Sequence, residues 1–338
     1  MRVLMLTSYP PMRGGIAAYS AQAVVALRRD GHEVVVASPE PSEADRVIDV
    51  RRRGAGFRLA RLARQCERLV VQFQPEMLGA PGTSARGRAQ ALLRLAAGLW
   101  AAPSSEVCVH EMDYGEQLRA RIFRAFARPI WKLANQFTVH TEGERQDFAA
   151  AFGIDEERIR VVSQAAHLLR RTDADRATAR ASLGLPVDPV LLLAIGFLQP
   201  HKGFDRAIRA FAGLDAGQAR LYVVGSVWRD DATSRSHLAE LRRLAAETPG
   251  TELREVYLSD EEFDRWIVAA DALVLPYRLG WSSNVMERGM LYDRAVIMSR
   301  VGGMVEQGAD RAGVTLVEDD SGLRDALRQA VRELPTAR

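Results

Sequence analysis

Short apolar runs alternate with stretches of helical periodicity along the whole chain. The runs of the first half are rich in β-branched residues and are predicted as strands at Val3–Leu6, Val34–Ala37, Leu69–Phe73, Val107–Val109, Phe137–Val139 and Arg160–Val162. Helices are predicted between them at Ile16–Asp30, Ala89–Trp100 and Leu118–Leu133. Because strands that are apolar throughout need cover on both faces, the pattern indicates a parallel sheet between helical layers.

The second half repeats this alternation. Its strands are predicted at Val190–Ile195, Leu221–Val224, Glu252–Val256, Ala272–Leu275 and Ala295–Met298, and its helices at Asp205–Ala212, Ser236–Glu247, Asp260–Ala270 and Asn284–Leu291. Residues 169–189 are polar, charged and Pro-bounded, which predicts a linker. A chain of 338 residues suits two domains. The sequence therefore predicts an α/β protein whose two doubly wound, Rossmann-like domains, 1–168 and 190–338, face a central cleft at the carboxyl ends of their strands.

The composition limits the class of protein. It is 47% apolar and 26% charged, and no stretch approaches the ~20 apolar residues of a membrane span. The first apolar run ends in Tyr9-Pro10-Pro11 and is predicted as a strand and its loop, not a signal peptide. Cys66 and Cys108 stand outside any motif, which favours a reducing cytoplasm. The net charge is only +3 and no nucleic-acid motif is present, so no nucleic-acid partner is expected.

Lysine is almost absent, since only Lys132 and Lys202 are lysines among 46 basic residues. Lys202 lies in a short loop between a predicted buried strand and a helix. A compact ammonium beside a positive helix N-terminus suits a phosphate group. The alternative is a solvated loop charge, and we favour the phosphate site because of the motifs that follow downstream.

The segment 270–306 places another loop and helix start after a buried strand. Ser282, Ser283, Asn284 and Val285 offer hydroxyls and free backbone N–H groups, which suit a diphosphate. Glu287 lies on the first turn of the predicted helix. Its spacing alone fits either a ligand-binding carboxylate or a capping-box partner of Asn284.

Glycines and one histidine occupy other strand ends. Gly14 and Gly15 follow the first strand and let a backbone approach a phosphate or a sugar closely, although they form no dinucleotide fingerprint. Gly196 and Gly225 end two strands of the second half and are predicted to border the same ligand. His110 follows a central strand of the first half, where a structural histidine is the alternative to a functional one.

In their order along the chain, these residues resemble a known family. Gly-Gly near the start, GHEVVV at 31–36, His-Glu after a central strand, G-x5-KG opening the second half, and ADALVLPY followed by Glu and VGG are similar to the retaining glycosyltransferases of family 4, which have the GT-B fold. The resemblance covers residues 3–306 and is specific only as an ordered set. It implies an enzyme that moves a sugar from a nucleotide-diphosphate donor to an acceptor hydroxyl with retention of configuration.

The resemblance also implies roles for particular residues. Lys202 matches the lysine that binds the donor diphosphate, and the helix start at 282–285 matches the amides that hold the same phosphates. Glu287 matches the second Glu of an E-x7-E pair, the one that binds the ribose. Gly15 matches a glycine near the reaction centre, and His110 matches a histidine against the transferred sugar. His110, Lys202 and Glu287 are therefore the predicted catalytic residues.

Two positions depart from the family pattern. Leu279 stands where the first Glu of the pair contacts the donor sugar, and Phe197 stands where an Arg usually follows the strand glycine. Arg278 is a candidate for the missing positive charge, with an ordinary surface arginine as the alternative. These departures leave open a catalytically idle protein that binds nucleotide sugars. A nucleotide-sugar epimerase would need acid/base carboxylates in the cleft, and none stands out.

Neither a metal nor a resident cofactor is predicted. Lys202 and the helix start at 282–284 can neutralise the charge of a leaving diphosphate. The D-x-D sequence Asp173-Ala174-Asp175 lies in the predicted linker, away from any strand end. The nucleotide sugar is then a co-substrate, and the resemblance implies front-face substitution in which the leaving phosphate deprotonates the acceptor hydroxyl.

The acceptor is left open as a small molecule, a glycan or a lipid-linked molecule. Its polar candidates lie at or after first-half strand ends: Gln72, Gln74, Glu76, Glu111 and Asp113. The stretches 51–68 and 119–132 are basic, and the second interleaves its charges with apolar residues. Such a helix can lie on an anionic membrane, or it can bury its aromatic face and solvate its arginines. The predicted location is the cytoplasm, with peripheral contact at the inner membrane face as the open alternative.

Overall fold

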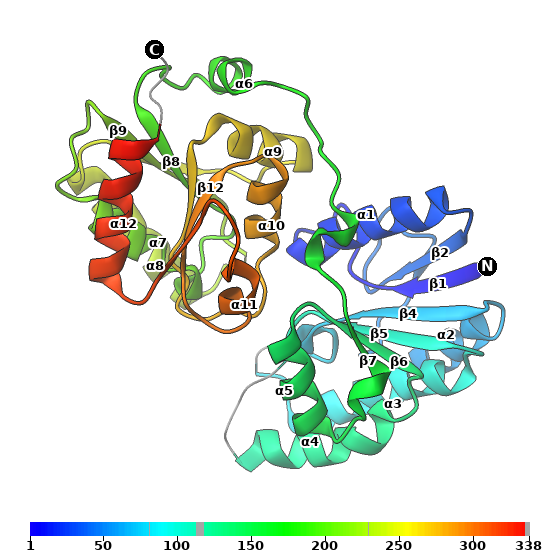
Figure 1. Cartoon of the computed structure of the whole chain (residues 1–338). Helices are drawn as coiled ribbons and strands as arrows, with labels where there is room; N and C mark the ends of the chain where they lie inside the picture. The colour runs from blue at the N-terminus through cyan, green and yellow to red at the C-terminus, as the bar shows by residue number, and fades with distance from the viewer. Residues whose placement is uncertain (81, 113–117, 229, 335–338) are drawn as a thin grey trace. The chain divides into compact units, whose positions relative to one another are not determined.

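The computed structural model describes residues 1–80, 82–112, 118–228 and 230–334, without the side chains of 118–120. The chain divides into two compact units, Met1–His167 and Leu168–Arg338 (Figure 1). Both units are α/β, with parallel sheets and covering helices, as the alternating pattern predicts.

The first unit contains a seven-stranded parallel sheet in the order β3-β2-β1-β4-β5-β6-β7. Its strands are β1 Arg2–Leu6, β2 Glu33–Ser38, β3 Arg46–Val47, β4 Arg68–Phe73, β5 Ser105–Val109, β6 Gln136–Val139 and β7 Ile159–Val161. Its helices are α1 Gly15–Arg29, α2 Ala55–Ala63, α3 Ala85–Ala101, α4 Leu118–Trp131 and α5 Glu142–Phe152. Figure 1 shows α1 on one face of the sheet and α2 to α5 on the other. Side chains of alternate strand positions, such as Val3 and Met5, therefore pack under α1.

The second unit contains a six-stranded parallel sheet in the order β10-β9-β8-β11-β12-β13. Its strands are β8 Val190–Ile195, β9 Ala219–Gly225, β10 Thr251–Glu255, β11 Ala272–Leu275, β12 Ala295–Ser299 and β13 Val314–Val317. Its helices are α6 Arg176–Ser182, α7 Phe204–Phe211, α8 Ala232–Glu247, α9 Asp260–Ala269, α10 Asn284–Leu291, α11 Met304–Gly308 and α12 Asp320–Glu333. The central strands β8 and β11 are buried throughout, which explains their continuous apolar runs.

Strand order locates a candidate site in each unit. In the first sheet the chain runs outward from β1 to β2 and β3 and then returns to pair β4 with the other side of β1. In the second sheet β8 and β11 stand in the same relation. Ligands of open α/β sheets bind beyond the carboxyl ends of strands at such a reversal. The loops after β1 and β4 and those after β8 and β11 are therefore the places to examine.

The segment predicted as a linker, 169–189, is folded onto the second unit. It contains α6, whose Arg180 is only 1% exposed. Arg180 donates to the Ala269 carbonyl at 2.9 Å and to the Asp271 carboxylate at 2.6 Å. Asp175, part of the D-x-D sequence, caps α6 by accepting from the Thr178 N–H at 2.7 Å. The polarity that suggests a linker thus comes from groups that hold a helix in place.

Candidate functional site

Lys202 lies at the carboxyl end of β8, in a single 3-10 turn, Pro200–Lys202, that leads into α7. The turn is held close to the end of β11. The backbone N–H of Arg278 donates to the His201 carbonyl at 2.8 Å, and a Cβ on Gly203 would stand 2.0 Å from the Pro276 carbonyl oxygen. Gly203 also has a φ of +65°, so this position needs glycine for two reasons.

The Lys202 ammonium lies over the Tyr277 ring, 4.0 Å from its centroid. No carboxylate of the described residues lies within ion-pair distance of this ammonium. Burial, with Lys202 and His237 nearby, lowers the pKa of the adjacent His201 to about 4. The loop therefore presents one uncompensated positive charge on a fixed backbone, as an anion-binding site requires.

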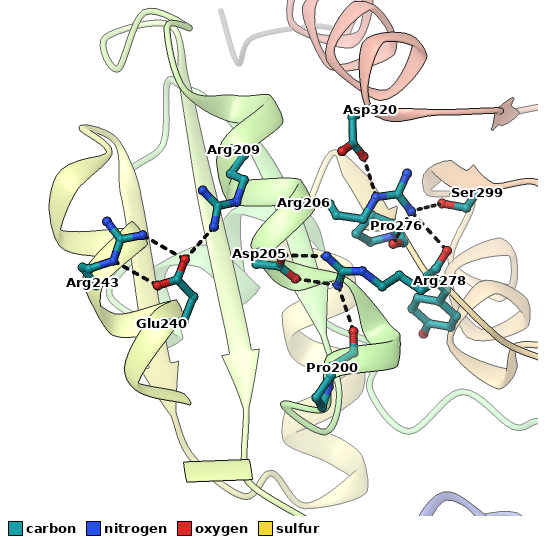
Figure 2. A network of polar contacts seen from close by, with 11 residues as sticks. Pro200, Asp205, Arg206, Arg209, Glu240, Arg243, Pro276, Arg278, Ser299 and Asp320 are labelled. Atoms are coloured by element: carbon teal, nitrogen blue, oxygen red, sulfur yellow. Dashed lines mark hydrogen bonds and ion pairs between the residues drawn. The ribbon is translucent and has the colours of Figure 1, made fainter. Parts of the chain in front are cut away.

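Arg278 has a different environment from Lys202. Its guanidinium forms two 2.7 Å hydrogen bonds with the Asp205 carboxylate and donates to the Pro200 carbonyl at 2.9 Å (Figure 2). Burial would raise the pKa of Asp205, but the Arg278 guanidinium holds it below its ordinary value. The positive charge of Arg278, a predicted donor contact, is thus balanced by a carboxylate at the start of α7.

Arg206, on α7, also connects the Lys202 loop to neighbouring strand ends. It donates to the Pro276 carbonyl at 2.9 Å and the Ser299 hydroxyl at 3.2 Å, and it pairs with Asp320 at 2.5 Å (Figure 2). These contacts join α7 to the carboxyl ends of β11 and β12. The loop that carries Lys202 is consequently tied to its neighbours by two arginines that sequence reasoning assigns no such role.

The glycines predicted at the ends of β8 and β9 are explained by backbone packing. A Cβ on Gly225 would lie 1.7 Å from the Gly196 carbonyl oxygen, and Gly196 has a φ of +134°. Between them the backbones of the two strand ends approach too closely for any side chain. Phe197, which replaces the family arginine, packs its ring edge against Trp228 with centroids 4.7 Å apart.

The helix start at 282–285 is capped by Ser283. Its hydroxyl accepts from the Met286 N–H at 3.3 Å, and its own N–H donates to the Gln307 side-chain oxygen at 2.6 Å. Ser282 stands just before the cap, and Asn284 and Val285 form the first turn of α10. The residues predicted to hold phosphates thus share one helix N-terminus, and Gln307 fixes its first residue.

Glu287 is buried and is not part of a capping box. One carboxylate oxygen, Oε1, accepts from Arg311 at 2.8 Å and from the Gln307 side chain at 3.2 Å. The other, Oε2, is buried and has no hydrogen-bond partner in the described part of the chain. A buried carboxylate oxygen without a donor carries a large desolvation cost, which a bound ligand with hydroxyl groups would remove. The capping alternative for Glu287 is therefore not what the structure shows.

In the first unit the glycine pair opens α1, and the space beside Gly15 is empty. A Cβ on Gly15 would meet no atom of the described residues within 4 Å, and Gly14 is the residue before the helix. Packing within this unit therefore gives no reason for glycine at position 15, in contrast to position 203. A ligand that approaches the backbone here would give one.

His110 lies in a cluster of histidines around the Tyr19 ring. Its Nε2 is 2.7 Å from the Gln72 side-chain oxygen, and its Nδ1 is 3.4 Å from Nε2 of His140. The Tyr19 ring stands edge-on to His110, His140 and His167, with centroids 4.9, 6.0 and 5.9 Å away. Burial, with His140 beside it, holds the pKa of His110 well below 6.5, so this imidazole is neutral.

The same cluster contains a group with the spacing of a metal site. Cys108 Sγ and one ring nitrogen each of His110 and His140 lie within 4.8 Å of one another, and no other such group occurs among the described residues. Burial raises the pKa of the Cys108 thiol, so this sulfur is protonated at neutral pH. It lies 4.0 Å from His140 Nε2, and His140 Nδ1 is 2.9 Å from the Val162 carbonyl. The cluster is thus a neutral network of weak and ordinary hydrogen bonds that a soft cation could enter only by displacing the thiol proton.

The predicted acceptor residues fall at the same edge of the first sheet. Gln72 is buried and bound to His110, whereas Gln74 and Glu76 lie at the turn after β4 and Glu111 is exposed after β5. Asp113 lies outside the described residues. Sequence reasoning missed His140 and Tyr19. The available signal was a second Val-His pair, at 139–140, that follows β6 as 109–110 follows β5.

Comparison with known families agrees with this arrangement. Residues 14–165 match the family described as "Glycosyl transferase 4-like domain", and residues 189–334 match "Glycosyl transferases group 1". The chain belongs to the family 4 glycosyltransferases, with the GT-B fold. The first matched segment contains β2 to β7, and the second contains β8 to β13.

Individual relatives and solved structures share only a minority of their residues with this chain. D-inositol 3-phosphate glycosyltransferase of Nocardioides sp. is 31% identical over 215 residues, which are 60% of this chain and 47% of that protein. The chain thus spans about half the length of the curated relatives it matches. HepE from Anabaena, solved in complex with UDP-glucose, has a TM-score of 0.74 at 15% identity and covers 98% of this chain and 90% of its own. Sucrose-phosphate synthase from Thermosynechococcus elongatus has a TM-score of 0.74 at 16% identity, with the same coverage, and shows the same fold.

Proposed function

We propose that this protein is a nucleotide-sugar-dependent glycosyltransferase whose second unit binds the donor. The observation that carries the proposal is the Lys202 ammonium, which has no carboxylate partner within the described ranges. It lies on the Tyr277 ring, between the ends of β8 and β11, which are joined by the Arg278 N–H to His201 carbonyl bond. A leaving diphosphate develops negative charge as the sugar departs, and a fixed cation at that position lowers the barrier because it needs no reorganisation.

Glu287, which follows the loop between β11 and α10, supports the same proposal. Tyr277 begins this loop, and Ser283, which is linked to Glu287 through Gln307, ends it. The free Oε2 would accept hydrogen bonds from ribose hydroxyls, while the amides at the start of α10 would face the phosphates. One loop would then hold both halves of a nucleoside diphosphate.

In the first unit, the neutral histidine network would border the transferred sugar and the acceptor. His110 can donate or accept a hydrogen bond without bringing a positive charge beside the forming oxocarbenium-like centre. Among the described residues, no pair of carboxylates is placed for double displacement. We therefore propose front-face substitution with retention, in which the leaving phosphate takes the proton of the acceptor hydroxyl, and no catalytic divalent ion.

The donor and acceptor classes follow from the relatives. UDP-glucose is the first donor to test because HepE was solved with it. D-inositol 3-phosphate is the first acceptor to test because several relatives act on it by name. We also propose a cytoplasmic location for this enzyme.

The test is release of nucleotide from UDP-, GDP-, ADP- and dTDP-sugars by the purified chain, with EDTA present and with and without acceptor. We expect slow donor hydrolysis that acceptor accelerates, a loss of at least about 10²-fold in Lys202→Ala, and none in Lys132→Ala, which removes the other lysine. Binding of a nucleotide without turnover of any donor would favour the catalytically idle alternative. Activity that requires an added divalent ion would contradict the metal-free mechanism.

A further inference from the structure

One surface of the first unit combines an unusual charge with exposed apolar side chains. It is formed by the outer sides of α2, α3 and α4, which lie next to one another on one face of the sheet (Figure 1). We call it the α2–α4 face. The stretches that form it, 51–64, 85–101 and 118–132, contain fourteen Arg or Lys residues and no Asp or Glu. Because the whole chain has a net charge of only +3, the remainder is net acidic.

Four of these charges have no carboxylate partner among the described residues. Arg58, Arg61, Arg64 and Arg121 are exposed, and none has a carboxylate within ion-pair distance among the described residues. Arginines that repel one another and have no acidic neighbour do not stabilise the fold. Their concentration on one face creates a positive potential that would attract an anionic partner.

The outer side of α4 also exposes apolar side chains. Ile122, Phe126 and Pro129 are exposed at helical spacing and form one stripe, which Arg121 and Arg128 flank. The opposite side of α4 buries Ala127, Ile130 and Trp131 in the core. Packing in the core thus explains the apolar residues on the inner side of α4 but not those of the exposed stripe.

The neighbouring helices extend the same pattern. Phe57 on α2 and Trp100 on α3 are 74% and 70% exposed, and Leu93 on α3 is also exposed. The Arg64 guanidinium lies over the Trp100 ring, 5.8 Å from its centroid. An exposed Trp beside an arginine is typical of a side chain placed at the boundary between headgroups and acyl chains.

We propose that the α2–α4 face docks on the surface of an anionic lipid bilayer. Lipid phosphates would pair with the arginines, and Phe57, Leu93, Trp100, Ile122 and Phe126 would enter the acyl boundary. A second copy of the chain that packs through the same face is disfavoured because two such basic faces repel. Nucleic acid would leave the aliphatic stripe of α4 in water. No helix of the described residues is both long and apolar enough to cross a bilayer, so the contact is peripheral.

The α2–α4 face is connected in sequence to the candidate site of the first unit. Helix α4 follows the carboxyl end of β5, the strand end that carries His110. A chain docked in this way would hold that strand end near the bilayer. The docking itself does not depend on the proposed glycosyl transfer, because it involves none of the residues assigned to donor or sugar.

The experiment is sedimentation of the full chain with vesicles of phosphatidylcholine containing 30% phosphatidylglycerol, compared with pure phosphatidylcholine, without any nucleotide sugar. We expect binding to the anionic vesicles only, weakened by salt. The triple variant Arg58→Glu, Arg61→Glu, Arg121→Glu should lose at least about tenfold in partitioning, since each basic residue near an anionic surface contributes on the order of fivefold.

Two comparisons make the result specific. The variant Arg220→Glu, Arg324→Glu, Arg332→Glu makes the same charge change on exposed residues of the second unit and should bind as the wild type does. Ile122→Ser with Phe126→Ser should weaken binding severalfold with unchanged circular dichroism, because both side chains are exposed. Equal losses in both triple variants would contradict the proposal, as would binding to neutral vesicles or tighter binding to duplex DNA or RNA at the same salt.

Discussion

The carboxyl ends of the strands carry opposite chemistry in the two units. In the second unit the loops are charged and tied down: Lys202 stands free on a backbone that Arg206 and the Arg278–Asp205 pair hold in place. In the first unit the corresponding edge is neutral: His110, His140 and Tyr19 form an uncharged cluster beside an open glycine. Under the proposed function, the charged edge would hold the leaving diphosphate and the neutral edge would accommodate the sugar.

The strongest test of the tied loop is Gly203→Ala. The new Cβ would lie 2.0 Å from the Pro276 carbonyl oxygen at a φ of +65°. We expect a loss of roughly 2–5 kcal/mol in the free energy of unfolding, with nucleotide affinity lost as well. Gly213→Ala is the matched control, since Gly213 also has a positive φ but has no described atom within 4 Å of its Cβ position. Equal destabilisation in the two variants, measured by urea unfolding, would show that backbone strain alone explains the effect.

Gly15→Ala should behave in the opposite way. Gly15 begins α1 and has open space around it, so alanine should raise the free energy of unfolding by up to about 1 kcal/mol. If sugar and acceptor approach this backbone, the methyl group should lower the transfer rate by roughly ten- to a hundredfold. Unchanged kinetics would mean that the open space beside Gly15 is not part of the site.

Glu287→Gln examines a buried carboxylate on the first turn of α10. The substitution keeps the shape of the side chain and removes its negative charge. It thereby removes the ion pair with Arg311 and replaces one carboxylate oxygen with an amide NH₂ group. We expect nucleotide affinity to fall about tenfold, equivalent to the loss of one charged hydrogen bond. Calorimetric titration with UDP gives the affinity, and thermal unfolding gives the stability. A large drop in melting temperature with unchanged affinity would make Glu287 a purely structural residue.

The neutral cluster predicts a particular pH dependence. Burial lowers the pKa values of His110, His140 and His167 below the ordinary 6.5, so the unfolded chain binds protons more readily than the folded one as the pH falls. Their contribution to stability is complete above pH 6.5 and is lost progressively below it. The melting temperature should therefore fall between pH 7 and pH 5, and less steeply in His110→Gln. Identical slopes in variant and wild type would mean that His110 is charged or exposed in solution.

The sequence predicts the strands of both sheets well because a run of apolar residues is enough to identify a buried strand. Val190–Ile195 and Ala272–Leu275 are observed with the predicted bounds, since a fully buried strand is apolar at every position. Helix α2 was not predicted. Its buried side is made of small residues such as Ala55 and Ala63, so its arginines dominate the pattern. Helix α6, within the predicted linker 169–189, was not predicted for a related reason, because a buried arginine such as Arg180 looks polar in the sequence.

The site could be predicted only in part. Resemblance located Lys202, Glu287 and the helix start at 282–285, all of which the structure places at strand ends or on the following helix. It could not show that Arg278 is balanced by Asp205 or that Gln307 joins Ser283 to Glu287, because those partners are separated in sequence by 73, 24 and 20 residues. Such pairings depend on how the helices pack on the sheet, which a single sequence does not contain.

The central claim is that the second unit holds a nucleoside diphosphate at Lys202. Calorimetric titration of the purified chain with UDP, GDP, ADP and dTDP, repeated on Lys202→Ala and Lys132→Ala, tests it most directly. The account predicts tight binding of one nucleotide, weakened more than tenfold by Lys202→Ala and unchanged by Lys132→Ala, as loss of one charged contact requires. Equal affinity in all three proteins would remove Lys202 from the site and contradict the account.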